Sequence, residues 1–308
     1  MIYSMSIKSI KKYIPEYLWE FLRLQSILHS HRQTAAFWDR SLEAYEHGAI
    51  ERFPIKPKLE NIPINKVIWQ YWGQGFTDED LPEMVKLCFD SVDRYCGDFK
   101  VIRLSDSNLY DYIDLPSYVV EKYNSGVIGR AHFSDIVRLA LLSAYGGLWL
   151  DATIFLTGEI PEYCCDGDWF MYQRDDAQED KKLWRRTYAY YFGWHKHFKV
   201  RVLNSIIWAK KDNKVIMDLF QLLQSFWKEE EHAPDYFFFQ ILFTEYMRVN
   251  EASNCEVKSD CIPNLLQMYL TGSYQRYTIE SILNMTSLHK LSYKTITSKQ
   301  IQSLLKLD

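Results

Sequence analysis

The stretch AHFSDIVRLALLSAYGGLWLDAT, residues 131–153, decides the fold of this chain. Its first half carries apolar residues at the spacing of a single helical face: Phe133, Ile136, Val137, Ala140 and Leu141. The double glycine Gly146-Gly147 then provides a helix end that tolerates positive φ. The apolar letters LWL that follow are typical of a short buried strand. We therefore predict a helix over 132–145 and a strand over 148–151.

Three charged residues stand out within this apolar stretch. Asp135 and Arg138 are three positions apart, which brings them together on the flank of the apolar helix face. Asp151 ends the predicted strand, and ligands of open α/β sheets bind outside the carboxyl ends of strands. Singly, such an ion pair is common on a helix surface, and such an aspartate is common as a helix N-cap. Together in one helix-Gly-Gly-strand unit, they indicate a binding site.

Patterns on either side of this unit predict an α/β fold. The segments KVIWQYW (66–72) and FKVIRLS (99–105) are typical of strands, and apolar spacing between 80 and 95 predicts a helix. The resulting β-α-β-α-β order predicts a mostly parallel central sheet flanked by helices. Residues 53–65 are proline-rich and are expected to form a linker. The charged run 174–186 lacks apolar periodicity and is expected to be a mobile surface loop.

Composition excludes some classes of protein. The formal net charge of −4 argues against a nucleic-acid-binding protein, which would show a basic domain. The six cysteines lack the paired spacing of a zinc site and are expected to be reduced thiols in a cytosol. Aromatic residues make up 16% of the chain, a share that suits carbohydrate binding but also large cores.

The N-terminal region has a charge of its own. Residues 1–33 carry five basic residues against two acidic ones, together with several aromatic and leucine residues. The basic residues are Lys8, Lys11, Lys12, Arg23 and Arg32. Such a helix either lies on an anionic membrane surface or packs on the main domain with its charges in water. It falls short of the ~20 apolar residues that a membrane span needs. We expect a cytoplasmic protein, with peripheral contact to the inner face of the cell membrane as the open alternative.

The central stretch, extended to SDIVRLALLSAYGGLWLDATIFL (134–156), resembles the nucleotide-sugar signature of glycosyltransferase family 32 and of bacterial capsular polysaccharide synthesis glycosyltransferases. Those enzymes share an SD-x-x-R helix, a double glycine and a DxD at the strand end. IWQYWGQG (68–75), DYFFFQILF (235–243) and LHKLSYK (288–294) resemble further blocks of the same families. The likeness runs in order over roughly residues 64–294.

This resemblance implies a glycosyltransferase-A type fold. Residues 64–308 would form the catalytic domain with a C-terminal helical tail, and residues 1–63 an N-terminal helical extension and linker. The implied enzyme moves a sugar from a nucleoside diphosphate sugar, expected to be a UDP-sugar, with retention at the anomeric carbon. Its acceptor would be a surface polysaccharide of capsular or O-antigen type, or a lipid-linked oligosaccharide.

The resemblance also implies roles for single residues. Asp151, as the first acid of the DxD, would bind ribose and a divalent cation, Mn²⁺ or Mg²⁺. Asp135 would bind the ribose or sugar hydroxyls, and Arg138 would lie against the sugar or the diphosphate. Trp72 would stack on the nucleobase, although a core tryptophan fits the sequence equally well. Asp235, which opens the third block, is the candidate on the acceptor side.

The motif departs from the family pattern at its third position, which reads Asp151-Ala152-Thr153. A hydroxyl is a weaker ligand of hard cations than a carboxylate, so Thr153 would be a weak metal ligand. His289 would be a further metal ligand and Lys290 a compensating charge for the diphosphate. The intact DGD at 166–168 is a rival, but its Asp-Gly is typical of a turn and no apolar strand precedes it.

Two other classes of protein remain open. A phosphotransferase of the haloacid dehalogenase type also places an aspartate after an apolar strand, as D-x-D-x-T, but that strand is normally the first of the chain. A non-catalytic nucleotide-sugar-binding protein of the same fold is consistent with the missing acid at Thr153.

Overall fold

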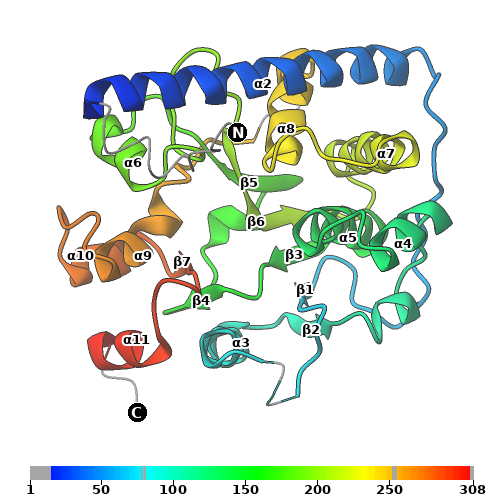
Figure 1. Ribbon diagram of the computed structural model, residues 1–308. Coiled ribbons are helices and arrows are strands. Elements are labelled where there is room, and N and C mark those ends of the chain that lie inside the picture. The colour runs from blue at the N-terminus through cyan, green and yellow to red at the C-terminus, as the bar shows by residue number, and fades with distance from the viewer. Residues whose placement is uncertain (1–14, 78, 80, 252–254, 306–308) are drawn as a thin grey trace, which may run out of the picture.

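The computed structural model describes residues 15–77, 79, 81–251 and 255–305 (Figure 1). The helices are α2 (Glu16–Glu46), α3 (Glu83–Tyr95), α4 (Ser117–Asn124), α5 (Arg130–Tyr145), α6 (Lys181–Thr187), α7 (Lys214–Glu229), α8 (Phe238–Val249), α9 (Leu265–Leu270), α10 (Ile279–Met285) and α11 (Ser298–Leu305). The strands are β1 (Val67–Tyr71), β2 (Lys100–Leu104), β3 (Gly147–Leu150), β4 (Ile154–Leu156), β5 (Trp169–Gln173), β6 (Val202–Ala209) and β7 (Leu288–Lys290).

Five strands form a central sheet in the order β2-β1-β3-β6-β5. Strand β1 pairs in parallel with β2 and with β3, while β6 is antiparallel to both β3 and β5. Four of the five strands therefore share one direction and β6 runs against them. The expectation of a mixed α/β fold with a mostly parallel sheet is confirmed. A second, two-stranded sheet pairs β4 with β7 in antiparallel fashion.

The helix-glycine-strand unit forms as its sequence predicts. The apolar face of α5, from Phe133 to Leu141, is fully buried against the rest of the core. Helix α5 ends at Gly146, where φ is +68°, and Gly147 follows with φ of +101°. A Cβ at Gly147 would lie 2.4 Å from the carbonyl oxygen of Val67 in β1. Only glycine allows both this backbone conformation and this close approach of β3 to β1.

Helices α7 and α8 lie between the sheet and the long helix α2, which spans one side of the molecule (Figure 1). Two buried hydrogen bonds hold α2 in place. Trp38 donates from Nε1 to the carbonyl oxygen of Phe238 at 2.9 Å, and Tyr45 donates to Asp218 in α7 at 2.7 Å. The buried side chains of α2 begin at Ile27 and continue to Tyr45, so from its middle onward α2 is part of the packed core.

The expected strands and the expected helix between them are confirmed by β1, β2 and α3. The proline-rich segment 53–65 contains neither a helix nor a ladder strand, and its Ile62 is buried in the core. The expectation that 174–186 is a mobile surface loop is wrong. Arg174 is buried, Trp184 is fully enclosed, and residues 181–187 form α6. The many charged residues of this segment gave no sign of its burial. One buried arginine and one buried tryptophan are enough to anchor a segment that is otherwise polar.

Within the described part of the chain, no helix is both long enough and apolar enough to cross a membrane. Lys8, Lys11 and Lys12, on which the expected membrane contact partly depends, lie outside the described residues. Arg23 and Arg32 lie on α2, where Arg32 is exposed and Arg23 is half-buried.

Candidate functional site

A cavity of about 900 Å³ opens at the carboxyl ends of β1 and β3. Because β6 runs in the opposite direction, its amino end reaches the same edge of the sheet. Trp72 follows β1, Asp151 follows β3, and Asn204 and Ser205 lie near the start of β6, and all four line the cavity. Helix α5 contributes a further wall. The cavity thus lies where ligands of open α/β sheets bind.

Arg138 links the two aspartates that the sequence singles out. Its Nη1 lies 3.0 Å from Asp135 Oδ1, and its Nη2 lies 3.2 Å from Asp151 Oδ1. The guanidinium also donates to the carbonyl oxygen of Asn204 at 2.7 Å and to Ser134 Oγ at 3.0 Å. It lies over the indole of Trp149, 5.1 Å from the ring centroid. These contacts fix Arg138 in one position between the carboxylates.

The two carboxylates differ in their exposure and in their acidity. The side chain of Asp135 is 7% exposed, while that of Asp151 is 23% exposed and faces the cavity. Burial raises the pKa of Asp135 despite the neighbouring Arg138. Burial also acts to raise the pKa of Asp151, but Arg138 and Lys290 outweigh it and hold that pKa below its usual range. Asp151 is therefore the more acidic and the more accessible of the two carboxylates.

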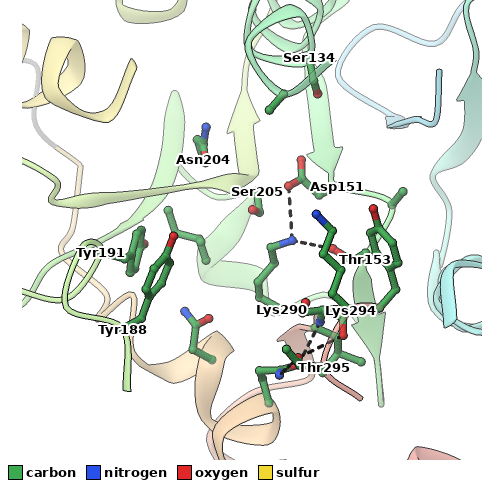
Figure 2. Close-up of a pocket in the computed structure, with 18 of the residues that line it drawn as sticks. Ser134, Asp151, Thr153, Tyr188, Tyr191, Asn204, Ser205, Lys290, Lys294 and Thr295 are labelled. Atoms are coloured by element: carbon green, nitrogen blue, oxygen red, sulfur yellow. Dashed lines mark hydrogen bonds and ion pairs between the residues drawn. The ribbon is translucent and has the colours of Figure 1, made fainter. Parts of the chain in front are cut away.

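An antiparallel strand pairing brings Lys290 to Asp151. Strand β7 pairs with β4, which places Lys290 opposite Ile154, just after the Asp151 motif. The ammonium of Lys290 donates to Thr153 Oγ1 at 2.5 Å and lies 3.6 Å from Asp151 Oδ2 (Figure 2). The segments that meet here are more than 130 positions apart in the chain. The structure therefore places Lys290 in the cavity beside Asp151.

The structure does not bring His289 into the cavity. Successive residues of a strand point to opposite faces, so His289 points away from the cavity that Lys290 lines. His289 is fully buried, and its Nε2 lies 3.0 Å from Thr157 Oγ1. Burial lowers its pKa to about 3. The prediction that His289 binds a metal beside Asp151 is not supported by this placement.

Trp72 and Asp235 have different positions relative to the cavity. Trp72 is half-buried in its wall, with the ring of Tyr293 packed edge-on at 5.7 Å between centroids. Asp235 accepts from the backbone N–H of Phe237 at 2.8 Å and from Ser30 Oγ at 2.5 Å, so its carboxylate holds the start of α8 to α2. Its neighbour Tyr236 lines the cavity, but Asp235 does not.

The rival DGD at 166–168 lies before β5 and not after a strand. Its Asp168 forms an exposed ion pair with Lys210 at 2.8 Å. Because Lys210 directly follows β6, this pair lies at the opposite edge of the sheet from the cavity. The structure therefore favours Asp151 over the DGD as the ligand-binding acid.

Several lining residues were not singled out from the sequence, although Tyr236 and Lys294 lie within the blocks 235–243 and 288–294. Asn204 donates to Asp135 Oδ1 at 2.7 Å, and Tyr188, Tyr236 and Lys294 form exposed parts of the wall (Figure 2). One signal was available for Asn204, because the polar pair Asn204-Ser205 interrupts the apolar strand VLNSIIWA. Tyr188, Tyr236 and Lys294 lie outside the helices and strands, so no apolar pattern marked their side chains as part of the site.

The divalent cation that the resemblance implies does not fit these residues. Asp151 Oδ1 is occupied by Trp149 Nε1 at 2.8 Å and by Arg138, and Thr153 Oγ1 already accepts from Lys290. Among the described residues, no cluster of three or more His, Cys, Asp or Glu side chains could hold a metal ion. The position next to the Asp151 motif holds an ammonium group instead.

The chain matches the profile of a known family over residues 18–306, nearly its whole length, and that family is described as "Capsular polysaccharide synthesis protein". The chain belongs to this family.

Shorter matches link the chain to named fungal enzymes. "O-glycosyltransferase braB" of Annulohypoxylon truncatum is 31% identical over 111 residues, which is 32% of this chain and 25% of that protein. "O-glycosyltransferase PaGT" of Phomopsis amygdali is 33% identical over 106 residues, which is 32% of this chain and 26% of that protein. The matched segment thus spans about a quarter of the length of these curated relatives. The family match and both names support an enzyme that transfers a glycosyl group.

Among solved structures, "PaToxG Glycosyltransferase" aligns with 91% of this chain and 94% of its own. The TM-score is 0.38 at 14% sequence identity, and a likeness at this level carries no further weight.

Proposed function

We propose that this protein is a glycosyltransferase that moves a sugar from a nucleoside diphosphate sugar to a hydroxyl group of an acceptor glycan. The observation that carries the proposal is the cluster of Asp135, Arg138, Asp151 and Lys290 in one cavity at the carboxyl ends of β1 and β3. Membership of the capsular polysaccharide synthesis family and the names of the fungal relatives support it. The finer expectation of a glycosyltransferase-A type fold is part of this proposal.

The donor would lie along the edge of the sheet. Trp72 would stack on the base, since it is the aromatic residue that directly follows β1 in the cavity wall. Asp151 is the accessible carboxylate and would accept from hydroxyl groups of ribose or sugar, with Asp135 behind it. Lys290 would lie against the diphosphate. Arg138 would keep both carboxylates in place and contribute positive charge to the same region.

In the transfer step, the bond between the anomeric carbon and the diphosphate oxygen breaks, and its electron pair stays on the diphosphate. The acceptor oxygen forms the new bond to the anomeric carbon. We propose retention, with the acceptor attacking from the leaving-group face and giving its proton to the departing diphosphate. Fixed cations stabilise the charge that develops on the leaving group, and removing one such group typically costs about 10²–10³ in rate.

The acceptor would approach past Tyr188 and Tyr236. These rings are 45% and 63% exposed where they line the cavity, and aromatic faces suit the apolar faces of sugar rings. A growing surface polysaccharide or a lipid-linked oligosaccharide is the proposed acceptor class, because the family description refers to capsular polysaccharide synthesis. Asp235 is not part of this proposal, because its carboxylate holds α8 to α2.

A panel experiment tests the proposal. Thermal unfolding with UDP-, GDP- and dTDP-sugars should identify a donor that raises the melting temperature by mass action. The same donor should then be hydrolysed slowly, or transferred to added glycans. Stabilisation by a donor without turnover under any condition would indicate a non-catalytic binding protein. Hydrolysis of p-nitrophenyl phosphate that depends on Asp151 would instead indicate a phosphotransferase.

We also infer that the protein binds peripherally to an anionic membrane, through α2 and α6. The first turns of α2 expose Tyr17, Leu18, Phe21 and Leu22 by 75%, 39%, 55% and 46%. These residues recur at i, i+1, i+4 and i+5 and so share one side of the helix. An exposed apolar patch of this kind marks an interaction site.

Basic residues of α6 lie next to the same N-terminal part of α2 (Figure 1). Helix α6 lies next to the N-terminal part of α2 in Figure 1. Four basic residues and one acidic residue, Glu20, line a shared cavity of about 430 Å³ between them; the basic ones are Arg23, Lys181, Lys182 and Arg185. Glu20 lies 3.8 Å from Arg185, which leaves an excess of positive charge. Acidic residues precede α6, but three of them, Asp176, Glu179 and Asp180, are paired with arginines elsewhere in the fold. Cations next to exposed apolar side chains match the chemistry of an anionic lipid surface.

Vesicle sedimentation tests the membrane proposal. The protein should sediment with vesicles that contain phosphatidylserine and should detach at high salt. Phe21→Ser/Leu22→Ser and Lys181→Glu/Lys182→Glu should each stay in the supernatant. The matched control Lys210→Glu/Lys211→Glu changes a lysine pair that follows β6 and should bind like wild type. Binding that is equal for all four proteins would exclude this surface.

A further inference from the structure

We propose that Lys290 replaces the divalent cation in this site, so that the donor diphosphate is bound and released without a metal. The inference rests on the proposed function. It follows from three features of the described residues: the position of the ammonium group, the state of the oxygen atoms around it, and the charge of the cavity lining.

The backbone fixes the position of the ammonium group. Lys290 pairs with Ile154 in the β4–β7 ladder, and the next N–H, of Leu291, donates to the carbonyl oxygen of Thr153 at 3.0 Å. The lysine stem therefore starts beside the Asp151 motif. Its Nζ ends 2.5 Å from Thr153 Oγ1 and 3.6 Å from Asp151 Oδ2, with its side chain 25% exposed toward the cavity. Figure 2 shows Lys290 and Lys294 extending into the cavity from the same side.

The oxygen atoms that could hold a metal are already engaged. Asp151 Oδ1 accepts from Trp149 Nε1 and faces Arg138, while Oδ2 faces Lys290. Thr153 stands where the family pattern has its second acid, and a neutral hydroxyl binds a hard cation weakly. An ion that used Asp151 Oδ2 would also lie close to the ammonium of Lys290 and be repelled by it. Thr153 and Lys290 therefore fit each other: the Thr153 hydroxyl accepts a hydrogen bond from the Lys290 ammonium, at the position where the family's carboxylate would bind a metal ion.

The charge of the lining suits a diphosphate on its own. Among the described residues that line the cavity, four are basic and two are acidic. The basic ones are Arg130, Arg138, Lys290 and Lys294, and the acidic ones are Asp135 and Asp151. Nucleoside diphosphates are polyanions, and a net positive lining attracts them without a bridging cation. In a metal-dependent site the balance is reversed, because carboxylates must first attract the metal.

In the transfer step, Lys290 would donate to the diphosphate oxygen that receives the electron pair of the broken anomeric bond. The hydroxyl of Thr153 would keep the ammonium in place before the donor binds and would release it to the phosphate afterwards. Lys290 would thus have two alternative acceptors, Thr153 before the donor binds and the leaving group afterwards. The proton of the acceptor hydroxyl leaves with the diphosphate, so no charged group of the protein changes its protonation state.

Titration calorimetry with UDP and GDP tests the nucleotide part of the proposal. The affinity of the wild type for the better nucleotide should be the same, within about twofold, in EDTA and in Mn²⁺. Lys290→Met keeps the stem and removes the charge, and it should weaken binding about 10- to 100-fold. Lys210→Met, which removes a lysine from the exposed pair with Asp168, is the matched control and should bind like wild type. A tenfold or larger gain in wild-type affinity on adding Mn²⁺ would overturn the proposal.

Electron paramagnetic resonance of Mn²⁺ gives a second readout, which needs neither nucleotide nor turnover. The wild type should leave Mn²⁺ free in solution. Thr153→Asp/Lys290→Ala restores the second acid and removes the cation, and it should bind Mn²⁺ measurably. Mn²⁺ binding by the wild type as tight as by this double variant would overturn the proposal. If neither nucleotide binds any variant while the Mn²⁺ result holds, the proposed donor class fails and the exclusion of the metal by Lys290 stands.

Discussion

The described part of the chain contains two buried arginine–aspartate clusters, and their surroundings differ. Arg174 and Asp260 form a two-pronged pair, with Nε to Oδ1 at 2.9 Å and Nη2 to Oδ2 at 2.8 Å, and both side chains are fully buried. Rings of Tyr191, Phe192 and Trp194 surround the guanidinium at about 5 Å. Arg138, by contrast, is shared between two aspartates at the wall of a cavity.

The difference lies in what remains available to a ligand. Arg174 also donates to the carbonyl oxygens of Gly193 and Tyr191, and the Tyr191 hydroxyl donates to Asp260, so this cluster is saturated within the protein. In the Arg138 cluster, Asp151 keeps 23% of its side chain exposed to the cavity. A saturated cluster stabilises the chain, whereas an open one is available for chemistry. Substitutions in the two clusters should therefore have different consequences.

The largest effect on stability is expected for Arg174→Met. The change leaves Asp260 buried without its cation, and breaking a buried pair in this way costs about 3–5 kcal/mol. Chemical denaturation should show this loss in the free energy of unfolding. Arg174→Met/Asp260→Leu removes both charges and should recover most of it. A loss below about 1 kcal/mol in the single variant would show that the pair is not the anchor of segment 174–194.

Arg138→Met should affect transfer more than stability. Asp135 loses one partner but keeps the hydrogen bond from Asn204, so we expect a stability loss of about 1–3 kcal/mol. The rate of transfer should fall about 10²–10³-fold, because a fixed cation is lost beside the leaving group. Steady-state kinetics and denaturation on the same preparation separate the two effects. If Arg138→Met kept normal turnover and lost as much stability as Arg174→Met, the Arg138 cluster would have a structural role like that of the Arg174 cluster.

The parts of the site that are close in sequence could be predicted. Helix α5, the double glycine and the strand before Asp151 follow one another, so apolar spacing and glycine position define them. The relation of Arg138 to Asp135 follows from helix geometry alone. Strand geometry would also have separated His289 from Lys290, because neighbouring strand residues face opposite ways.

The contacts between distant segments could not be predicted. Lys290 meets Thr153 only because β4 pairs with β7, and no local pattern specifies the partner of a three-residue strand. The saturation of Arg174 depends on Asp260, 86 positions away, so a run of charges looked like a solvated loop. The domain division at residue 63 stays a prediction.

The smallest expected effect concerns pH. The pKa of Asp151 is lowered in the fold, so its ionised form contributes stability that is present above about pH 4 and is lost as the pH falls through the folded pKa. The stability difference between wild type and Asp151→Asn, about 1 kcal/mol near neutral pH, should therefore shrink in acid.

The pKa of Asp135 is raised instead, so protonation in acid relieves a cost of burial. Relative to Asp135→Asn, the wild type should gain stability as the pH falls. Denaturation curves between about pH 3 and pH 7 should thus show opposite trends for the two variants. Parallel trends would contradict the different environments of the two carboxylates.

The most direct test of Asp151 as the donor-binding acid compares two aspartates of equal chemistry. Asp151→Asn changes the cavity residue, and Asp168→Asn changes the DGD residue at the opposite edge of the sheet. With the nucleotide sugar that stabilises the wild type, we predict that Asp168→Asn transfers within about twofold of wild type and that Asp151→Asn loses at least about 100-fold. Full turnover by a folded Asp151→Asn variant would contradict the assignment of this cavity as the active site.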